Sequence, residues 1–304
     1  MARVVILGVV GDSGAGKTTL TRGLLRVLGE EDVARLSTDD YHRLDRRRRA
    51  QLGITPLDPA ANHLDILTQH VLHLRRGEPV LKPVYDHRDG TLRAPEYLRP
   101  ASFLLVEGLL GFHSETLRSA QHVKVFLAPA EELRRAWKVK RDCTHRGYTT
   151  DEVLRELDRR ETDAERWLRP QGEHADIVVS FREGLHAEVL LRDTLEHPDL
   201  SSVVETVRGE RGVLLRIPGD IPIEQAAELE EAIWGCMTFA SHLRVRRLGE
   251  YAVGTDLRRS PSLALVQVVL LFHLVHARAE LTTGAPVPRV PRARPTGADS
   301  ALHV

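Results

Sequence analysis

Residues 11–18 read Gly-Asp-Ser-Gly-Ala-Gly-Lys-Thr and lie between two segments with different patterns of apolar residues. The preceding run, 4–10, is apolar and rich in β-branched residues, which predicts a buried strand. The following run, 18–28, carries leucines at helical spacing. A glycine-rich turn from a buried strand into a helix predicts an α/β fold, with backbone N–H groups gathered where the helix begins.

The turn fits the phosphate-loop pattern G-x-x-x-x-G-K-[ST], which predicts nucleotide binding. The N-terminal end of the helix favours phosphate, Lys17 can reach the outer phosphates, and the Thr18 hydroxyl can bind Mg²⁺. We therefore expect ATP and Mg²⁺ as ligands. The alternative is a glycine-rich turn without a ligand. The predicted nucleotide-binding residues are Gly11, Asp12, Ser13, Gly14, Ala15, Gly16, Lys17, Thr18 and Thr19.

Composition argues against several classes of partner. Lys plus Arg and Asp plus Glu number 43 each, so net charge indicates neither nucleic acid nor an anionic membrane. The most apolar late run, 263–275, is too short to span a bilayer and predicts a buried helix. With 2 cysteines and no charged-then-apolar leader before the first strand, we expect a cytoplasmic protein without disulfides.

Strand-like and helix-like segments alternate through the first 180 residues. This order predicts a doubly wound, mainly parallel sheet with helices on both faces. The expected strands are 4–10, 33–36, 102–106, 122–127 and 176–179, and the expected helices are 18–28, 62–75, 131–145 and 150–167. Residues 37–45 are expected to form a loop.

The regular alternation of expected strands and helices ends near residue 184. Strands are expected at 188–195 and 212–217, and helices at 222–243 and 261–281. We divide the chain into a core, 1–183, a C-terminal α+β extension packed on it, 184–283, and a disordered tail, 284–304. The extension is either an appended lobe or a set of extra edge strands, and the sequence leaves both open.

Three further signals follow strands or lie on a helix. Asp39 comes after the second strand, where a carboxylate can accept a proton from a hydroxyl that attacks the γ-phosphate, although aspartate also favours turns. Glu107 ends a buried strand at the same sheet edge and can hold Mg²⁺, or is a solvated loop acid. Lys138 and Arg141 share one helix face beside Asp142, either as part of a lid or as an ordinary solvated face.

The order of the motifs resembles the phosphoribulokinase and uridine kinase family of P-loop kinases. The resemblance covers roughly residues 1–180. It rests on the phosphate loop, Asp-Asp-Tyr-His-Arg-Leu-Asp-Arg (39–46), Leu-Asp-Pro-Ala-Ala-Asn (57–62), Lys-Pro-Val-Tyr-Asp-His (82–87), Val-Glu-Gly-Leu (106–109) and Lys-Arg-Asp-Cys-Thr-His-Arg-Gly-Tyr (140–148). The segments at 39–46 and 57–62 favour the phosphoribulokinase branch.

The resemblance implies a role for each matching residue. Asp39 would take the proton from O1 of ribulose 5-phosphate, with Lys17 and Asp142 in the catalytic cluster. Thr18 and Glu107 would serve the metal. His42 and Arg46 would grip the sugar phosphate. Residues implied to bind the acceptor or neutralise phosphate charge are His42, Arg46, Tyr85, His87, Lys138, Arg141 and Arg146.

Two alternatives remain at this point. A uridine kinase-like enzyme, or another sugar or nucleoside kinase, would share most of the motifs. A nucleotide-binding regulator without turnover would be favoured if Asp39 or Glu107 were absent, and both are present. Ala15 stands where the thiol-regulated branch carries cysteine, so we expect no thiol switch. The resemblance suggests a homodimer that acts on a small sugar phosphate.

Overall fold

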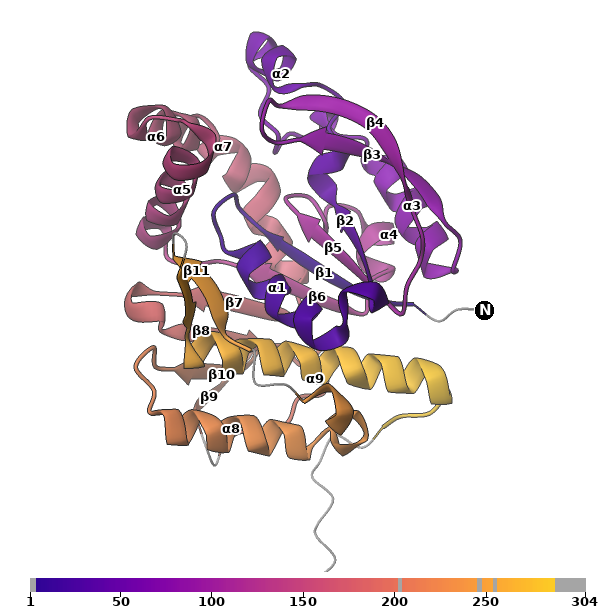
Figure 1. Cartoon of the computed structure of the whole chain (residues 1–304), viewed down its shortest axis with the longest axis vertical. Helices are drawn as coiled ribbons and strands as arrows, with labels where there is room; N and C mark the ends of the chain where they lie inside the picture. The colour runs from indigo at the N-terminus through magenta and orange to yellow at the C-terminus, as the bar shows by residue number, and fades with distance from the viewer. Residues whose placement is uncertain (1–3, 202–203, 245–247, 254–255, 288–304) are drawn as a thin grey trace, which may run out of the picture.

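The computed structural model describes residues 4–201, 204–244, 248–253 and 256–287 (Figure 1). Its centre is an eight-stranded sheet with the order β2-β5-β1-β6-β7-β8-β10-β9. The first five strands in this order are parallel. They are β2 (Val33–Ser37), β5 (Phe103–Gly108), β1 (Val5–Gly11), β6 (Val123–Leu127) and β7 (Ile177–Phe181). The predicted parallel core sheet is therefore present.

Alternate residues of β1 supply two cores, as the period of a strand requires. Val5, Leu7 and Val9 face the side covered by α1 (Lys17–Leu28), α8 (Ile223–Gly235) and α9 (Pro261–Thr283). Ile6 faces the opposite side, which α3 (Leu64–Arg75) and α4 (Glu115–Ser119) cover. Every residue of β1 is buried, and this explains its continuous apolar sequence.

The region after residue 184 continues the same sheet. Strands β8 (Ala187–Leu191), β10 (Gly212–Ile217) and β9 (Glu205–Gly209) add antiparallel to β7 and to one another. A small hairpin, β11 (Glu250–Val253) with β12 (Asp256–Arg259), lies before α9. Of the two arrangements that the sequence leaves open, the extra edge strands are the one observed. The boundary at residue 184 stays a division predicted from sequence.

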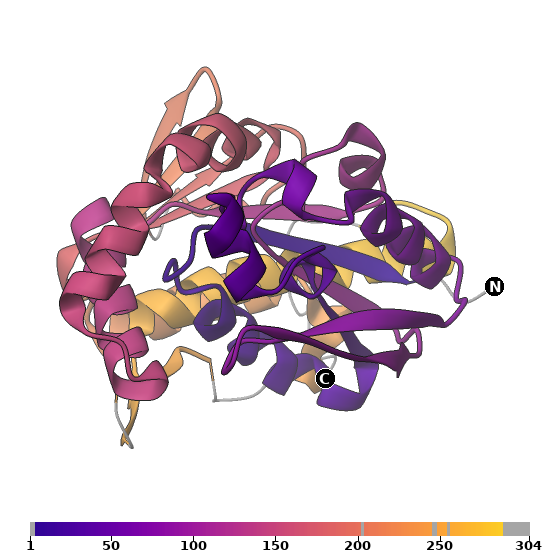
Figure 2. The ribbon, with the colours of Figure 1, turned by 90° about the horizontal axis from the view of Figure 1, so that it is seen from above.

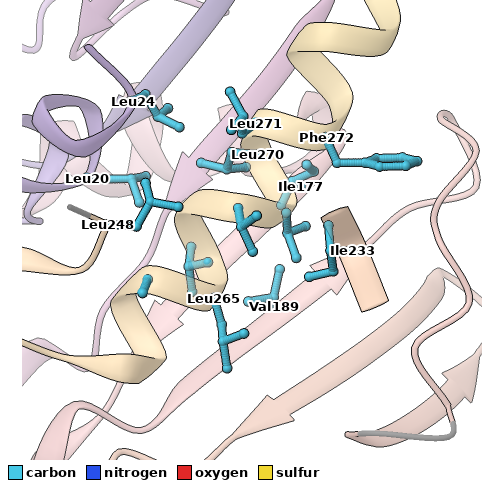
Figure 3. Close-up of a cluster of buried hydrophobic side chains, with 14 of the residues drawn as sticks. Leu20, Leu24, Ile177, Val189, Ile233, Leu248, Leu265, Leu270, Leu271 and Phe272 are labelled. Carbon is cyan, nitrogen blue, oxygen red and sulfur yellow. The ribbon is translucent and has the colours of Figure 1, made fainter. Parts of the chain in front are cut away.

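Helix α9 forms the centre of the larger core. Figure 3 shows its Leu265, Leu270 and Leu271 beside Leu20 and Leu24 of α1 and Ile177 of β7. The helix is longer than the apolar run predicts, and its length and hydropathy would suffice to cross a membrane. However, 83% of its most apolar window is buried inside the protein, as in the core helix of a globular fold.

Several elements escape the sequence prediction, among them α4, β9 and the β11–β12 hairpin. Strands β3 (Val80–Asp86) and β4 (Thr91–Leu98) form a separate antiparallel hairpin, and α2 (Arg46–Leu52) occupies the arginine run. Figure 2 shows this hairpin and the β9–β10 pair at opposite ends of the molecule. Residues 37–45, expected as a loop, contain a 3-10 turn at Thr38–Tyr41.

Several predicted helices and strands have different ends. The helix expected at 150–167 is interrupted: α6 (Thr150–Arg159) is followed by α7 (Glu161–Asp163) and a π turn, Ala164–Leu168. Helix α8 ends at Gly235 instead of residue 243, and β8 ends at Leu191 instead of residue 195. Helix α5 spans Glu131–Arg146, close to its prediction. The predicted tail lies outside the described residues from 288 onward.

Candidate active site

The loop between β1 and α1 has the backbone conformation that its glycines allow. Gly14 and Gly16 have φ values of 88° and 91°, in the left-handed region that residues with a Cβ rarely adopt. A Cβ on Gly14 would also lie 2.8 Å from the Cβ of Lys138. Helix α5 therefore packs directly against the loop, and the two glycines permit both the turn and the close approach.

Lys17 lies folded over the loop. Its Nζ donates to the carbonyl oxygens of Gly11, at 2.7 Å, and Asp12, at 3.0 Å. Burial lowers the pKa of Lys17, while Asp39, Asp12 and Glu107 act in the opposite direction. The next residues, Thr18 and Thr19, are exposed. The first turn of α1 thus presents an ammonium group and open hydroxyls at the sheet edge where the parallel strands end.

Two arginines that the sequence analysis missed hold the loop in place. Asp12 accepts from Ser13 N at 2.6 Å and pairs with Arg134 at 3.0 Å and Arg160 at 3.3 Å. Burial opposes ionisation of Asp12, but Arg160 and Arg134 outweigh it and keep its pKa below the usual value. Arg160 lies where the predicted helix breaks, so this break brings a buried cation to the loop.

Asp39 has one carboxylate oxygen that the described residues leave without a partner. Its Oδ1 is buried and has no hydrogen-bond partner among the described residues, while Oδ2 lies 3.6 Å from His87 Nε2. Burial works against the carboxylate, whereas His42, His87 and Lys17 favour it and hold its pKa below the usual value. Asp39 is therefore ionised at neutral pH, as a proton acceptor must be.

Glu107 lies at the end of β5, in register with Ser37 of β2 and Val9 of β1. Its Oε2 accepts from the Thr21 hydroxyl at 3.1 Å. Mg²⁺ usually keeps several waters and substrate phosphate oxygens as ligands, so the protein needs to supply only one or two. Glu107 and the exposed Thr18 hydroxyl fit that requirement. The described residues contain no group of three or more His, Cys, Asp or Glu side chains that could hold a metal by themselves.

The residues expected to bind an acceptor include aromatic rings and an arginine that contact one another or their neighbours. The Tyr85 ring meets the rings of His42 and His87 edge-on, with centroids 4.8 Å and 5.0 Å away. Arg46 donates to the Tyr148 hydroxyl at 2.9 Å and to His87 O at 2.6 Å, and so joins the β3–β4 hairpin to the loop after α5. Arg49, which we did not single out, donates to the Tyr85 hydroxyl at 2.8 Å and fixes that ring.

The predicted basic cluster surrounds one carboxylate. Asp142 accepts from Lys138 at 2.7 Å and Arg141 at 2.8 Å, and lies 3.3 Å from Arg146. Burial would raise the pKa of Asp142, but hydrogen bonds from Arg141 and Lys138 bring it to about 2. Arg141 also donates to the Ser13 hydroxyl at 3.1 Å, which connects the cluster to the phosphate loop.

The structure therefore brings the predicted residues together at one sheet edge. The loop 11–18, Asp39 and Glu107 follow neighbouring strands, and α5 adds the basic cluster. Lys138 and Asp142 are only 5% and 3% exposed, so of this cluster Arg141 and Arg146 are the more open to a ligand. In Figure 1, α5–α7 and the β3–β4 hairpin lie on either side of the loop after β1.

Comparison with known proteins places this site in a family. Residues 6–184 match the Phosphoribulokinase / Uridine kinase family. The chain is 38% identical to phosphoribulokinase of Synechocystis sp. over 177 residues, which are 58% of this chain and 53% of that protein. It is 31% identical to chloroplastic phosphoribulokinase of Spinacia oleracea over 194 residues, 58% of this chain and 48% of that protein.

A uridine kinase of Staphylococcus epidermidis is 31% identical over 186 residues, 59% of this chain and 88% of that protein. The chain thus spans about half the length of the curated phosphoribulokinases that it matches. A solved phosphoribulokinase from Rhodobacter spheroides aligns with a TM-score of 0.58 and 18% identity, over 80% of this chain and 97% of that one.

That alignment confirms the predicted fold, an α/β P-loop kinase fold with a mainly parallel central sheet. The family match covers the phosphate loop, Asp39, Glu107 and the basic cluster, which are the same residues that the structure brings together. Sequence motifs, fold and site geometry agree, and the chain belongs to the phosphoribulokinase / uridine kinase family.

Proposed function

We propose that this chain transfers the γ-phosphoryl group of ATP to O1 of D-ribulose 5-phosphate and forms ribulose 1,5-bisphosphate. The observation that carries the proposal is Asp39, whose buried Oδ1 lacks a partner among the described residues and whose charge interacts with both His87 and Lys17. A base in this position could act on an acceptor that is held by Arg46 while the phosphate loop holds ATP.

The proposed reaction is one in-line displacement. The O1 hydroxyl gives its proton to Asp39 as O1 attacks the γ-phosphorus. The bond from that phosphorus to the bridging oxygen breaks, its electron pair stays on that oxygen, and ADP leaves. Lys17 and Arg141 neutralise charge on the transferred group. Thr18 and Glu107 would hold Mg²⁺, which supplies further charge neutralisation when it is bound.

The charge of the acceptor side supports a phosphorylated acceptor. Burial lowers the pKa of Arg146, as do the neighbouring charges of Arg141 and Arg46. Three guanidinium groups that repel one another are stabilised by a dianion, and arginine matches phosphate as a fork of donors. With a neutral nucleoside, the one negative charge of Asp142 would be shared among Lys138, Arg141 and Arg146, and positive charge would remain in excess. The similarity to named phosphoribulokinases supports the same choice.

The test is ADP release measured over a panel of pentose phosphates and nucleosides. We expect kcat/KM for ribulose 5-phosphate to exceed that for uridine by orders of magnitude. The Lys17→Ala variant is the control, because it removes the ammonium group that would neutralise phosphate charge, and that group lies on the phosphate loop. Preference for uridine would establish the uridine kinase alternative, and ATP binding without turnover of any acceptor would establish a regulator.

Two further properties belong to this proposal. We propose a homodimer, which light scattering of the purified chain tests directly. We also propose that the enzyme works in the cytoplasm, since a reducing compartment suits a chain with two free cysteines, Cys143 and Cys236.

A further inference from the structure

Asn62 is the single asparagine in the chain, and its side chain has one possible orientation. It ends the segment 57–62, to which the proposed reaction assigns no role. The side chain is 4% exposed, and its Nδ2 donates to Pro56 O at 3.1 Å and to Asp58 O at 2.8 Å. Because both amide hydrogens are used on carbonyl oxygens, the remaining atom, Oδ1, is the one that faces His42.

This orientation fixes the tautomer of His42. Asn62 Oδ1 lies 2.7 Å from His42 Nδ1, and an amide oxygen only accepts. His42 Nδ1 therefore carries the hydrogen, and in the neutral ring Nε2 keeps its lone pair. No hydrogen bond among the described residues uses that Nε2.

The backbone holds the two residues in this relation. His42 and Asn62 form an isolated antiparallel bridge. Arg43 N donates to Ala61 O at 2.9 Å, and His63 N donates to Tyr41 O at 2.8 Å. The residues on both sides of each partner are thus paired, so His42 cannot turn away without breaking them.

The surroundings keep the imidazole uncharged. Burial lowers the pKa of His42 to about 4. Asp39 and the hydrogen bond to Asn62 favour the imidazolium, but burial outweighs them. Arg49 and His87 also disfavour the imidazolium. At neutral pH, His42 is a neutral group that can accept a hydrogen bond at Nε2 but cannot supply a positive charge.

We propose that Asn62 is a positioning residue that fixes His42 as a hydrogen-bond acceptor, and that His42 Nε2 accepts from a hydroxyl of the sugar. The proposal rests on the proposed function for the identity of that sugar. It revises the role that the family resemblance implies for His42, which was to grip the phosphate. The phosphate is then left to Arg46 and Arg146, whose guanidinium groups keep their charge at every working pH.

The first test observes the protein without substrate. Histidine ¹⁵N labelling and long-range ¹H–¹⁵N spectra report which ring nitrogen carries hydrogen, and the signal that His42→Gln removes identifies His42. We expect the Nδ1–H form from pH 6 to 8. The exposed His73, identified by His73→Gln, is the matched control. An Nε2–H form, or an imidazolium at pH 6, overturns the proposal.

The second test uses the uniqueness of Asn62. Asparagine ¹⁵N labelling yields one side-chain amide pair, and we expect both of its hydrogens to exchange slowly because both are hydrogen-bonded in a buried site. In Asn62→Ala, the His42 signal should become a mixture of both tautomers. Fast exchange of the amide, or an unchanged His42 signal in Asn62→Ala, contradicts the positioning role.

The third test separates a hydroxyl acceptor from a phosphate grip. Asn62→Ala should raise KM for ribulose 5-phosphate about tenfold and leave KM for ATP unchanged. His42→Gln, whose amide oxygen reaches the region of Nε2, should retain more affinity for the sugar than His42→Leu. Equal loss in both His42 variants overturns the hydroxyl contact. If the wild-type chain does not use ribulose 5-phosphate, the proposed function fails. The role of Asn62 in fixing the His42 tautomer is then still decided by the NMR spectra of the protein without substrate.

Discussion

Lys82 Nζ lies 2.8 Å from Asp40 Oδ2, and this buried ion pair separates the roles of two adjacent aspartates. Asp40 Oδ1 also accepts from Tyr85 N at 3.0 Å, so both of its oxygens tie the 3-10 turn to β3. Asp39, one residue earlier, keeps a buried oxygen without a partner among the described residues. The family resemblance points to Asp39 as the base, and the structure adds the reason that Asp40 is not available, because Asp40 is engaged in the fold.

Substitution of each aspartate should therefore have a different effect. Asp39→Asn should reduce kcat by orders of magnitude, with little change in ATP affinity or stability, because it removes only the proton acceptor. Asp40→Asn leaves Lys82 with Glu96, 3.5 Å away, as its carboxylate partner, and should lower the free energy of unfolding by about 1–3 kcal/mol. Urea unfolding, ATP titration and steady-state kinetics on both variants check this. The account fails if Asp39→Asn turns over normally while folded.

Arg46 should control affinity for the acceptor. Arg46→Ala should raise KM for a phosphorylated acceptor by about tenfold or more and leave KM for ATP nearly unchanged, because a charged hydrogen bond to phosphate is lost. Tyr148→Phe removes the hydroxyl that accepts from Arg46 at 2.9 Å and should have the same effect in weaker form. An unchanged KM in Arg46→Ala would place the sugar phosphate elsewhere, even if kinase activity stands.

Thiol redox conditions should not switch the enzyme. Cys236 is buried after α8 and donates to Ala232 O, and Cys143 is half-buried on α5. Burial raises the pKa of the Cys236 thiol, which makes it a poor nucleophile. Activity after equilibration with oxidised and reduced thiol buffers should be the same. A large loss that dithiol treatment reverses would indicate a bridge that this structure does not contain.

Stability should fall in mild acid because of His122. Its Nδ1 accepts from Ile6 N at 2.9 Å, and burial, with Arg75 and Lys124, lowers its pKa to about 4. The unfolded chain then binds a proton more tightly than the folded one, so the stabilisation is complete above pH 6.5 and is lost as pH falls toward 4.

The matched variant is His122→Asn, whose amide oxygen can accept the same N–H without titrating. Between pH 7 and 4, the free energy of unfolding should decrease by about 2 kcal/mol less in this variant than in the wild type. His42 contributes in the same direction, so part of the dependence should remain. Identical pH profiles for wild type and variant would show that His122 does not carry the effect.

Much of the fold follows from short-range patterns. The parallel strands are buried on both faces, so β1, β5, β6 and β7 are continuous apolar runs that the sequence reveals. The β3–β4 hairpin lacks this signal, because β4 is almost wholly exposed and each strand contains a proline. Helix α2 consists largely of arginines, and its local signs are confined to its two ends, the N-cap Asp45 and the left-handed C-cap Gly53.

The candidate site divides in the same way. Glycine-rich turns and acids at strand ends have local signatures, so the phosphate loop, Asp39 and Glu107 could be predicted. Arg134 and Arg160 act on Asp12, 122 and 148 positions away, and Asn62 acts on His42, 20 positions away. The interruption after α6 is what brings Arg160 to Asp12, and no periodicity within 150–167 encodes it.

The central claim is transfer of phosphate from ATP to O1 of ribulose 5-phosphate with Asp39 as the base. The most direct measurement is ³¹P NMR of ATP and ribulose 5-phosphate incubated with the wild-type chain and with Asp39→Asn. We predict that the wild-type chain converts ATP to ADP with equal growth of a new sugar-phosphate resonance assigned to O1. Asp39→Asn should show neither change on the same time scale. Release of inorganic phosphate alone, phosphate on another oxygen, or the same product from Asp39→Asn would contradict the account.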